Sequence, residues 1–279
     1  MRKLLPGALP LALSLLVWLP LAFLGGGSLM SALELSGYLG PVLSDTPGYA
    51  FWRLLPCYPT LAPYVELLLD SPEFFVMFWN SVKLAAGSLL GQTFVAIPAA
   101  WWFARCSGRR SRGLFTLYII LMLMPFQVTM VSSYLVMDGT GLLDTHWSIL
   151  LPAIFSTFPI FIMHRFFKAI PQSVIEAAQI DGASSWQIFF HIGLPMGKNG
   201  VAAAMVLGFL EYWNLIEQPM TFLKSKTLWP LSLYLPQITA GKIGLALAAS
   251  VITLLPSILV FLYGQSYLEQ GIMASGAKE

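Results

Sequence analysis

Six stretches of about 20 or more mostly apolar residues run through this chain, and they constrain its fold more than any other feature. They cover residues 4–24, 73–100, 114–137, 147–166, 199–217 and 243–266. A helix of about 20 apolar residues crosses the hydrocarbon core of a bilayer, and in lipid a helix satisfies its own backbone polar groups. The pattern therefore predicts an all-α integral membrane protein with six transmembrane helices.

Composition supports this fold class. Hydrophobic residues make up 57% of the chain and charged residues only 10%, whereas soluble domains carry about 25% charged residues. The net charge of +2 gives no indication of nucleic-acid binding. The two cysteines, Cys57 and Cys106, form neither a metal-binding nor a redox pattern, and the three histidines have no metal-ligand spacing. We therefore predict no metal site and no catalytic residues.

The first apolar stretch has two interpretations. Met1-Arg2-Lys3, the apolar run and Ser31-Ala32 together resemble a secretory signal peptide. The apolar region of a signal peptide is about 7–15 residues long, and this run is longer. We therefore favour an uncleaved first helix over residues 1–24.

The orientation follows from lysine and arginine in the short loops, because cytoplasmic loops carry an excess of both. Arginines cluster between the second and third spans, and basic residues flank the loop 167–198. These residues are Arg105, Arg109, Arg110, Arg112, Arg165, Lys168 and Lys198. We interpret the arginine run as this topology signal and not as an anion site. Both termini, the loop 167–198 and a tail over 269–279 are then cytosolic.

The predicted organisation has an extracytoplasmic segment over 25–72, followed by a five-helix core over 73–268. Two shorter segments, 138–146 and 218–242, also face outward in this topology. Five prolines fall inside or at the ends of spans, where neighbouring helices or water satisfy the freed carbonyls. They are Pro98, Pro125, Pro152, Pro159 and Pro256.

The loop 167–198 has the pattern of two short, capped helices. Pro171 suits the first position of a helix, and Gln172 to Ile180 follows as its body. Gly182 stands where a helix ends in a left-handed residue, which glycine adopts at low cost. Ser184 and Gln187 form a capping-box pattern for a second, strongly apolar helix. We expect Pro195 to end that helix before the fifth span.

Such a loop has two physical interpretations of about equal weight. A short helix parallel to the membrane can dock into a cleft of a soluble partner. Ala177 and Ala178 would then allow the partner's backbone to approach closely, and Glu176 would accept hydrogen bonds or pair with a basic residue. Alternatively, the loop is an interfacial amphipathic helix that rests on lipid.

A resemblance favours docking. Glu176-Ala177-Ala178, Gly182, Ile192 and Leu194-Pro195 resemble the EAA loop in permease subunits of bacterial ABC importers, which carries the coupling helix that docks on the ATP-binding subunit. Further segments resemble the carbohydrate branch and, within it, the maltose-type second permease subunit. These are 181–184, Trp213-Asn214 with Pro219, Asn80-Ser81 and the tail 271–278. The resemblance covers about residues 70–279, whereas 25–72 is less typical.

The resemblance implies a type I ABC-importer-like permease in the bacterial cytoplasmic membrane, with the rest of the machine in other chains. Its partners would be a sister permease in a heterodimer, two cytosolic subunits that bind ATP and magnesium, and an extracytoplasmic solute-binding protein. This chain itself lacks the phosphate-binding pattern G-x-x-x-x-G-K-[ST]. The implied ATPase-coupling residues are Glu176, Ala177, Ala178, Asp181, Gly182, Ala183, Trp186, Ile192, Leu194 and Pro195, and the tail Ala274 to Glu279 would add a second contact.

Polar residues in the spans are candidates for the translocation pathway, because they cost free energy in lipid. Glu211, Asn214 and Gln218 are spaced to share one face of the fifth span, and Gln127 and Asn80 lie in the third and second. With Tyr212 and Trp213 beside them, the first three suit a hydroxyl-rich sugar. Amides also hydrogen-bond between helices, so packing is the competing interpretation.

Three alternatives to a sugar importer remain. An ABC importer of another solute, such as a polyamine, a phosphate ester or a metal chelate, would carry the same loop. An ion-coupled secondary transporter usually shows inverted repeats, which this sequence lacks, and would leave the loop unexplained. A membrane-embedded enzyme would need catalytic residues that the sequence does not offer.

Overall fold

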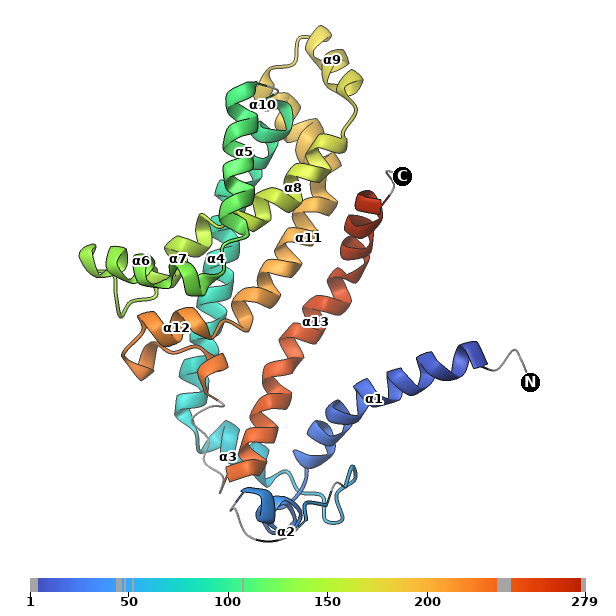
Figure 1. The fold of residues 1–279 in the computed structure, drawn as a ribbon, viewed down its shortest axis with the longest axis vertical. Helices are drawn as coiled ribbons and strands as arrows, with labels where there is room; N and C mark the ends of the chain where they lie inside the picture. The colour runs from blue at the N-terminus through green and yellow to red at the C-terminus, as the bar shows by residue number, and fades with distance from the viewer. Residues whose placement is uncertain are drawn as a thin grey trace. The chain divides into compact units, whose positions relative to one another are not determined.

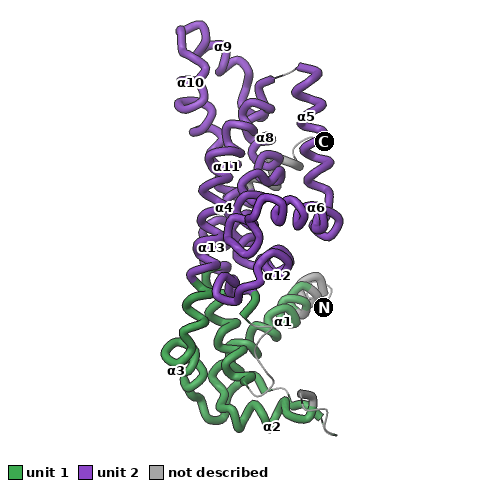
Figure 2. Tube along the Cα trace, turned by 90° about the vertical axis from the view of Figure 1, so that its left-hand side faces the viewer, with its two compact units in different colours: residues 1–78, 233–256 green, residues 79–232, 257–279 purple. Residues whose placement is uncertain are grey.

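The structure, a computed structural model, describes residues 5–43, 47, 49–51, 53–106, 108–234 and 242–276. Regular secondary structure over these residues is entirely helical (Figure 1). The chain divides into two compact units, coloured green and purple in Figure 2. Unit 1 comprises residues 1–78 and 233–256, and unit 2 comprises residues 79–232 and 257–279.

Unit 1 contains three helices of its own and the first part of two long ones. Its helices are α1 (Leu5–Gly27), α2 (Ala32–Leu43), α3 (Ala62–Leu69) and the starts of α4 (Pro72–Arg105) and α13 (Ile243–Gly276). Met30, Leu35 and Leu67 are at most 1% exposed and form its interior. In contrast, Leu16 and Trp18 of α1 are largely exposed, as expected of a helix that contacts lipid.

Unit 2 contains the remaining helices and the loop 167–198. They are the rest of α4 and α13, together with α5 (Arg109–Met122), α6 (Phe126–Gly139), α7 (Trp147–Ile154), α8 (Phe158–Ala169), α9 (Gln172–Ile180), α10 (Ser185–Ile188), the π-helical turn Phe189–Gly193, α11 (Leu194–Trp213) and α12 (Glu217–Phe222). Both ribbon views place α9 and α10 at one end of this unit and α12 toward the other.

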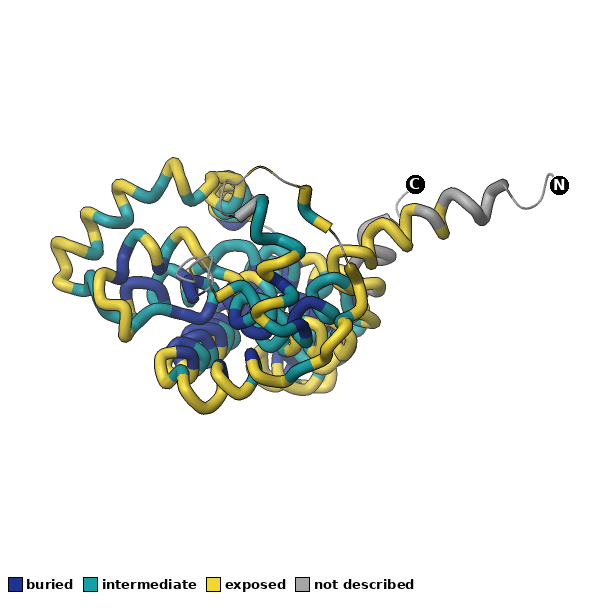
Figure 3. Tube along the Cα trace, turned by 90° about the horizontal axis from the view of Figure 1, so that it is seen from below, coloured by how far each residue is buried: buried dark blue, intermediate teal, exposed yellow. Residues whose placement is uncertain are grey.

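Within the described part of the chain, four helical segments are long and apolar enough to cross a membrane: residues 72–105, 147–169, 185–213 and 243–269. They match the predicted second, fourth, fifth and sixth spans. The first predicted span corresponds to α1, whose apolar part covers Leu13–Gly27. Figure 3 shows buried and exposed positions along the same helices, and the exposed faces carry many large apolar side chains. Such faces suit lipid or a partner chain.

The third predicted span is not one straight helix. Its two halves, α5 and α6, meet at an angle of 101°. Pro125 is the cause, because a proline inside a helix clashes with the carbonyl four residues earlier and lacks an N–H. It also disfavours helical backbone at the preceding residue. Pro125 instead has an extended ψ of 148° and starts α6 as its N-cap.

The fifth span begins earlier than predicted. Pro195 does not end the second short helix, because the segment from Ser185 to Trp213 is continuous. Pro195 lies in the first turn of α11, where its missing N–H is tolerated. The wider π-helical turn Phe189–Gly193 directly precedes it, and π turns of this kind often mark functional sites. At the other end of the chain, α13 continues to Gly276, so the predicted tail 269–279 is helical up to that residue.

Helices α8 and α11 form the most extensive helix–helix contact in the described part of the chain. Gly197 of α11 lies against the ring of Phe167 of α8, which is fully buried. Gly200 lies in the same way against Phe166. Small residues let transmembrane helices approach closely, so this glycine face fixes the distance between the two spans.

We expect Gly197→Val to destabilise the protein by about 1–3 kcal/mol, as overpacking of a close-packed site does. A Cβ at this position would lie 2.2 Å from Cε1 of Phe167. Thermal unfolding of the purified complex measures the effect. Gly113→Val in α5 is the matched control, because no atom lies within 4 Å of a Cβ there. Equal melting temperatures for the two variants would contradict the close contact.

The segment after α12 is tied to the rest of unit 2 by two polar side chains. Nδ2 of Asn80 in α4 donates to the carbonyls of Thr227 (2.7 Å) and Trp229 (3.2 Å). The carboxylate of Asp144 accepts from the backbone N–H groups of Lys224 and Ser225 and from the Ser225 hydroxyl. These hydrogen bonds, led by that of the Ser225 side chain, lower the pKa of Asp144. These hydrogen bonds hold the segment after α12 in a defined conformation.

Candidate functional site

The turn between α9 and α10 has the geometry that the sequence predicts. Gly182 has a φ of +82°, in the left-handed region. The N–H of Gly182 donates to the carbonyl of Gln179 (3.0 Å), and that of Ala183 donates to the carbonyl of Ala178 (2.9 Å). These two hydrogen bonds define a Schellman motif. The turn is thus fixed by its own backbone.

The predicted capping box is also present. Ser184 Oγ accepts from the backbone N–H of Gln187 (3.3 Å), and Gln187 Oε1 accepts from the backbone N–H of Ser184 (2.8 Å). Pro171 differs from the prediction by one position, since it is the N-cap of α9 and Gln172 is the first helical residue. The loop is therefore two short helices with a fixed angle between them.

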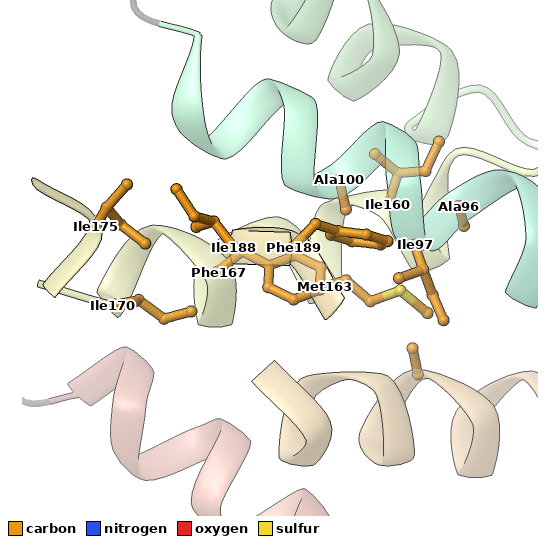
Figure 4. Close-up of a cluster of buried hydrophobic side chains, with 11 residues drawn as sticks. Ala96, Ile97, Ala100, Ile160, Met163, Phe167, Ile170, Ile175, Ile188 and Phe189 are labelled. Atoms are coloured by element: carbon orange, nitrogen blue, oxygen red, sulfur yellow. The ribbon is translucent and has the colours of Figure 1, made fainter. Parts of the chain in front are cut away.

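One side of this loop is anchored in the core of unit 2. Ile175, Ile188 and Phe189 are at most 6% exposed and belong to a buried cluster with residues of α4, α8 and α11 (Figure 4). Four of the predicted coupling residues pack against this cluster without being fully buried. They are Ala178, Ala183, Ile192 and Leu194. The loop is therefore packed against the spans α4, α8 and α11 on this side.

The other side of the loop is exposed. Ile180 and Trp186 are 86% and 69% exposed, and the Trp186 ring stacks on that of Phe190. The remaining predicted coupling residues share this exposure: Glu176, Ala177, Asp181, Gly182 and Pro195. Large apolar side chains exposed beside carboxylates on a rigid helical unit are typical of a surface that another protein covers.

A hollow of about 410 Å³ lies in this surface beside the turn. Its wall includes Asp181, Gly182, Gln187 and His191. The Nδ1 atom of His191 lies 3.1 Å from the carbonyl of Gln187, which orients the ring. The hollow is open to solvent and lies on the exposed side of the loop.

Arg105 connects the loop to α4, and the sequence did not indicate this role. Nη2 of Arg105 donates to the carbonyl of Phe167 (2.7 Å), and both terminal nitrogens reach the carbonyl of Ile170 (3.4 and 3.3 Å). Nη1 also lies 3.5 Å from Oε1 of Gln172, the first residue of α9. The guanidinium stacks over the ring of Trp101 at 4.8 Å.

The sequence indicated only a topology signal for the whole arginine run. Arg105 could therefore not be distinguished from the other arginines. The structure separates it from Arg109, Arg110 and Arg112, which are exposed, whereas Arg105 is half-buried. Trp101, on which it stacks, also contacts the rings of Phe167 and Phe189. The last turn of α4 thus holds the end of α8 and the beginning of the loop together.

The candidate pathway residues do not lie together on one helix face. Asn80 is buried, and its amide binds the carbonyls of the loop after α12, so its observed contacts are structural. The predicted shared face of Glu211, Asn214 and Gln218 is wrong, because α11 ends at Trp213 and Gln218 belongs to α12. Glu211 and Asn214 are exposed near the end of α11.

Pro219 explains the break. A continuous helix would place its ring against the carbonyl of Leu215, four residues earlier, and would leave that carbonyl without a donor. In the structure the chain instead turns at Leu215 and Ile216, and the hydroxyl of Ser232 donates to the Leu215 carbonyl. Asn214 turns its side chain back onto its own helix, donating to the Leu210 carbonyl (2.8 Å).

Gln127 has a partner that the sequence did not predict. Its Nε2 donates to Oε1 of Glu217, the first residue of α12, at 2.5 Å. Both side chains are exposed. No role was predicted for Glu217, which is the last residue of the predicted fifth span. Over the described residues, no group of three or more potential ligands for a metal ion is present.

Comparison with known proteins places the chain in a family. The chain belongs to the inner membrane components of binding-protein-dependent transport systems, whose family model matches residues 96–273. It is therefore a permease component of a transport system and not an enzyme. Several long apolar helices make it a multi-pass protein of the inner membrane.

Three similar proteins illustrate the family. The lactose transport system permease protein LacG of Rhizobium radiobacter is 31% identical over 203 residues, covering 72% of this chain and 74% of LacG. The sn-glycerol-3-phosphate transport system permease protein UgpE of Pectobacterium atrosepticum is 27% identical over 211 residues, covering 74% and 75%. A chain of a bacterial ABC transporter involved in the import of alginate matches with a TM-score of 0.81 and 22% identity, covering 95% of this chain and 96% of that one. This last similarity shows that the two chains share a fold.

Proposed function

We propose that this chain is the permease subunit of an ATP-binding-cassette importer that moves a sugar or sugar-like solute inward. The observation that carries the proposal is the loop 167–198. One side of it is anchored in the buried cluster by Ile175, Ile188 and Phe189. The other side exposes Glu176 and Trp186 for a partner. Because the loop is packed against the spans, movement of a docked partner would move the spans with it. A helix that only rests on lipid needs no such anchorage.

The topology that fits this function has six spans. They are α1, α4, the bent pair α5–α6, α7–α8, the continuous segment 185–213 and α13. The termini and the loop 167–198 then face the cytosol, in agreement with the basic residues near them. The exposed arginines 109, 110 and 112 at the start of α5 lie on the same side as the loop in this arrangement.

The proposal assigns ATP and magnesium to two cytosolic partner subunits, on which the coupling residues dock. When these subunits close on ATP, they would draw the loop with them, and the cluster around Phe167 together with Arg105 would pass that movement to α4, α8 and α11. A sister permease, in a heterodimer, completes the pathway. A solute-binding protein delivers the solute on the other side, as the name of the family indicates.

The substrate class rests on similarity and on the polar residues near the end of α11. LacG acts in lactose transport. The alginate importer, whose solute is an acidic polysaccharide, shares only the fold at 22% identity and does not decide the charge of the solute. UgpE acts in sn-glycerol-3-phosphate transport, so a phosphate ester is the alternative solute. Glu211 and Glu217 are acidic, which disfavours an anionic solute beside them.

Uptake of labelled solutes tests the proposal. Cells that carry the complete transporter, and matched cells from which this chain is deleted, are given labelled lactose, maltose, sn-glycerol 3-phosphate and spermidine. We expect ATP-dependent accumulation of a sugar that disappears with the deletion. Accumulation of the phosphate ester or the polyamine alone would replace the sugar by that solute, and uptake driven by an ion gradient without ATP would overturn the importer.

A further inference from the structure

Two interrupted helices meet in unit 2 at the end far from the coupling loop. The span α5–α6 breaks at residues 123–125, and the chain after α11 breaks at residues 214–216. The helices that start after these breaks, α6 and α12, contact each other through the rings of Phe126 and Phe222, 5.8 Å apart. Beside this contact, Thr221 Oγ1 lies 3.7 Å from Met130 Sδ.

The polar atoms at this junction are not covered by the rest of the subunit. Gln127 and Glu217 are both exposed, and the Gln127 amide holds one carboxylate oxygen of Glu217. Among the described residues, no lysine, arginine or histidine nitrogen lies within 4 Å of the Glu217 carboxylate, since the ion pair found there joins Lys242 to Glu66 in unit 1. Glu211, also exposed, adds a second carboxylate one turn before the break.

Exposing this junction to the hydrocarbon of the lipid would be energetically unfavourable. Interrupted backbone at membrane depth occurs where it is buried in protein or lines a water-filled cavity. Ionisable side chains in spans likewise face the interior of a bundle or an aqueous cavity. The exposed carboxylate and the two exposed breaks therefore indicate that α6 and α12 face the water-filled space that the assembled permease encloses.

We propose that Gln127 and Glu217 form a solute-binding subsite on the translocation pathway that accepts neutral, hydroxyl-rich solutes and rejects anionic ones. The inference rests on the proposed function and deepens it, because it names the charge of the solute. A sugar hydroxyl donates to the free oxygen of Glu217 and accepts from or donates to the Gln127 amide. A phosphate or uronate group would instead meet an uncompensated carboxylate.

The test measures water access and local charge without requiring the solute to be known. Cys57 and Cys106 are replaced by serine in the complete transporter, and Gln127→Cys is added. Two membrane-impermeant methanethiosulfonate reagents, one with a trimethylammonium group and one with a sulfonate group, then react with the assembled complex. Their rates are normalised to those on a small thiol in buffer. We expect the position to react, with the cationic reagent faster by about tenfold or more, as focused fields in clefts produce.

Three further variants make the test decisive. Adding Glu217→Gln removes the charge and should bring the normalised ratio close to one. Leu16→Cys, on an exposed apolar position of α1, should stay unreactive in lipid, and Asp138→Cys at the end of α6 should react with both reagents. Lack of reaction at position 127 while position 138 reacts would overturn the subsite, as would a ratio that Glu217→Gln leaves unchanged.

Failure of the subsite and failure of the proposed function give different results. If the unmodified transporter takes up no sugar, the proposed function fails whatever the thiol reactions show. If it takes up a sugar while position 127 is inaccessible, the pathway lies elsewhere and only the subsite is lost. Uptake of sn-glycerol 3-phosphate by the unmodified transporter at a rate equal to that of lactose would overturn the charge selection.

Discussion

Gly182→Val is expected to abolish most ATP-driven uptake while the chain still inserts into the membrane. The φ of +82° at Gly182 costs an ordinary L-residue about 1–2 kcal/mol, and a β-branched residue suffers most. A penalty of this size reduces the population of the docking conformation about 5–30-fold. Uptake of the transported solute and ATP hydrolysis by the purified complex, measured together, would show the loss of coupling.

Two control variants isolate the backbone effect. No atom lies within 4 Å of a Cβ placed on Gly182, so a clash cannot explain a defect. Gly182→Asn should retain most uptake, because asparagine tolerates left-handed backbone. Gly141→Val introduces the same kind of strain at a φ of +69° outside the loop and should leave coupling intact. Full uptake by Gly182→Val would contradict the role assigned to the turn.

Arg105→Ala is expected to have the second large effect. The variant removes the charged donor from the carbonyls of Phe167 and Ile170 and the stacking on Trp101. Charge-assisted hydrogen bonds contribute about 1.5–3 kcal/mol and cation–π contacts about 0.5–2 kcal/mol, so we expect a loss of about 2–5 kcal/mol. Thermal unfolding of the complex and the ratio of solute moved to ATP hydrolysed are the measurements.

The matched variants for Arg105 test geometry and charge separately. Arg105→Lys keeps the charge but not the planar fork of donors, so it should restore stability only in part. Arg112→Ala removes an exposed arginine from the same run and should change neither measurement. If Arg105→Ala behaves like Arg112→Ala, the arginine is a topology signal only, as the sequence alone had indicated.

The features that sequence predicted correctly are local. The capping box of Ser184 and Gln187 and the left-handed Gly182 are confirmed, because each depends on residues within one turn of the chain. The spans are long apolar runs, so the second, fourth and sixth appear close to their predicted limits, whereas the fifth begins earlier, at Ser185.

The features that sequence could not predict depend on tertiary contacts. Pro98 and Pro256 lie inside the unbroken helices α4 and α13, whereas Pro125 starts a new helix at a bend of 101° and Pro219 accompanies the end of α11. Whether a proline breaks a span depends on what satisfies the freed carbonyl. For Leu215 the donor is Ser232, 17 residues away, and no pattern around Pro219 reveals it.

The same limit applies to the candidate site. The pathway role predicted for Asn80 stays a prediction, but its amide binds the carbonyls of Thr227 and Trp229, which are far away in sequence and could not be foreseen. Arg105 donates to the carbonyl of Phe167, 62 residues away. Glu217 accepts from Gln127, 90 residues away. The sequence indicated only a topology signal for Arg105 and predicted no role for Glu217.

The most direct test of the central claim is the recovery of partners with this chain. The tagged chain is extracted from its own membranes in mild detergent, and the proteins that accompany it are identified by mass spectrometry. We predict an ATP-binding subunit and a second polytopic permease, with the ATP-binding subunit reduced when the chain carries Gly182→Val. Reproducible recovery of the folded chain without either partner would contradict the importer and favour a self-sufficient transporter.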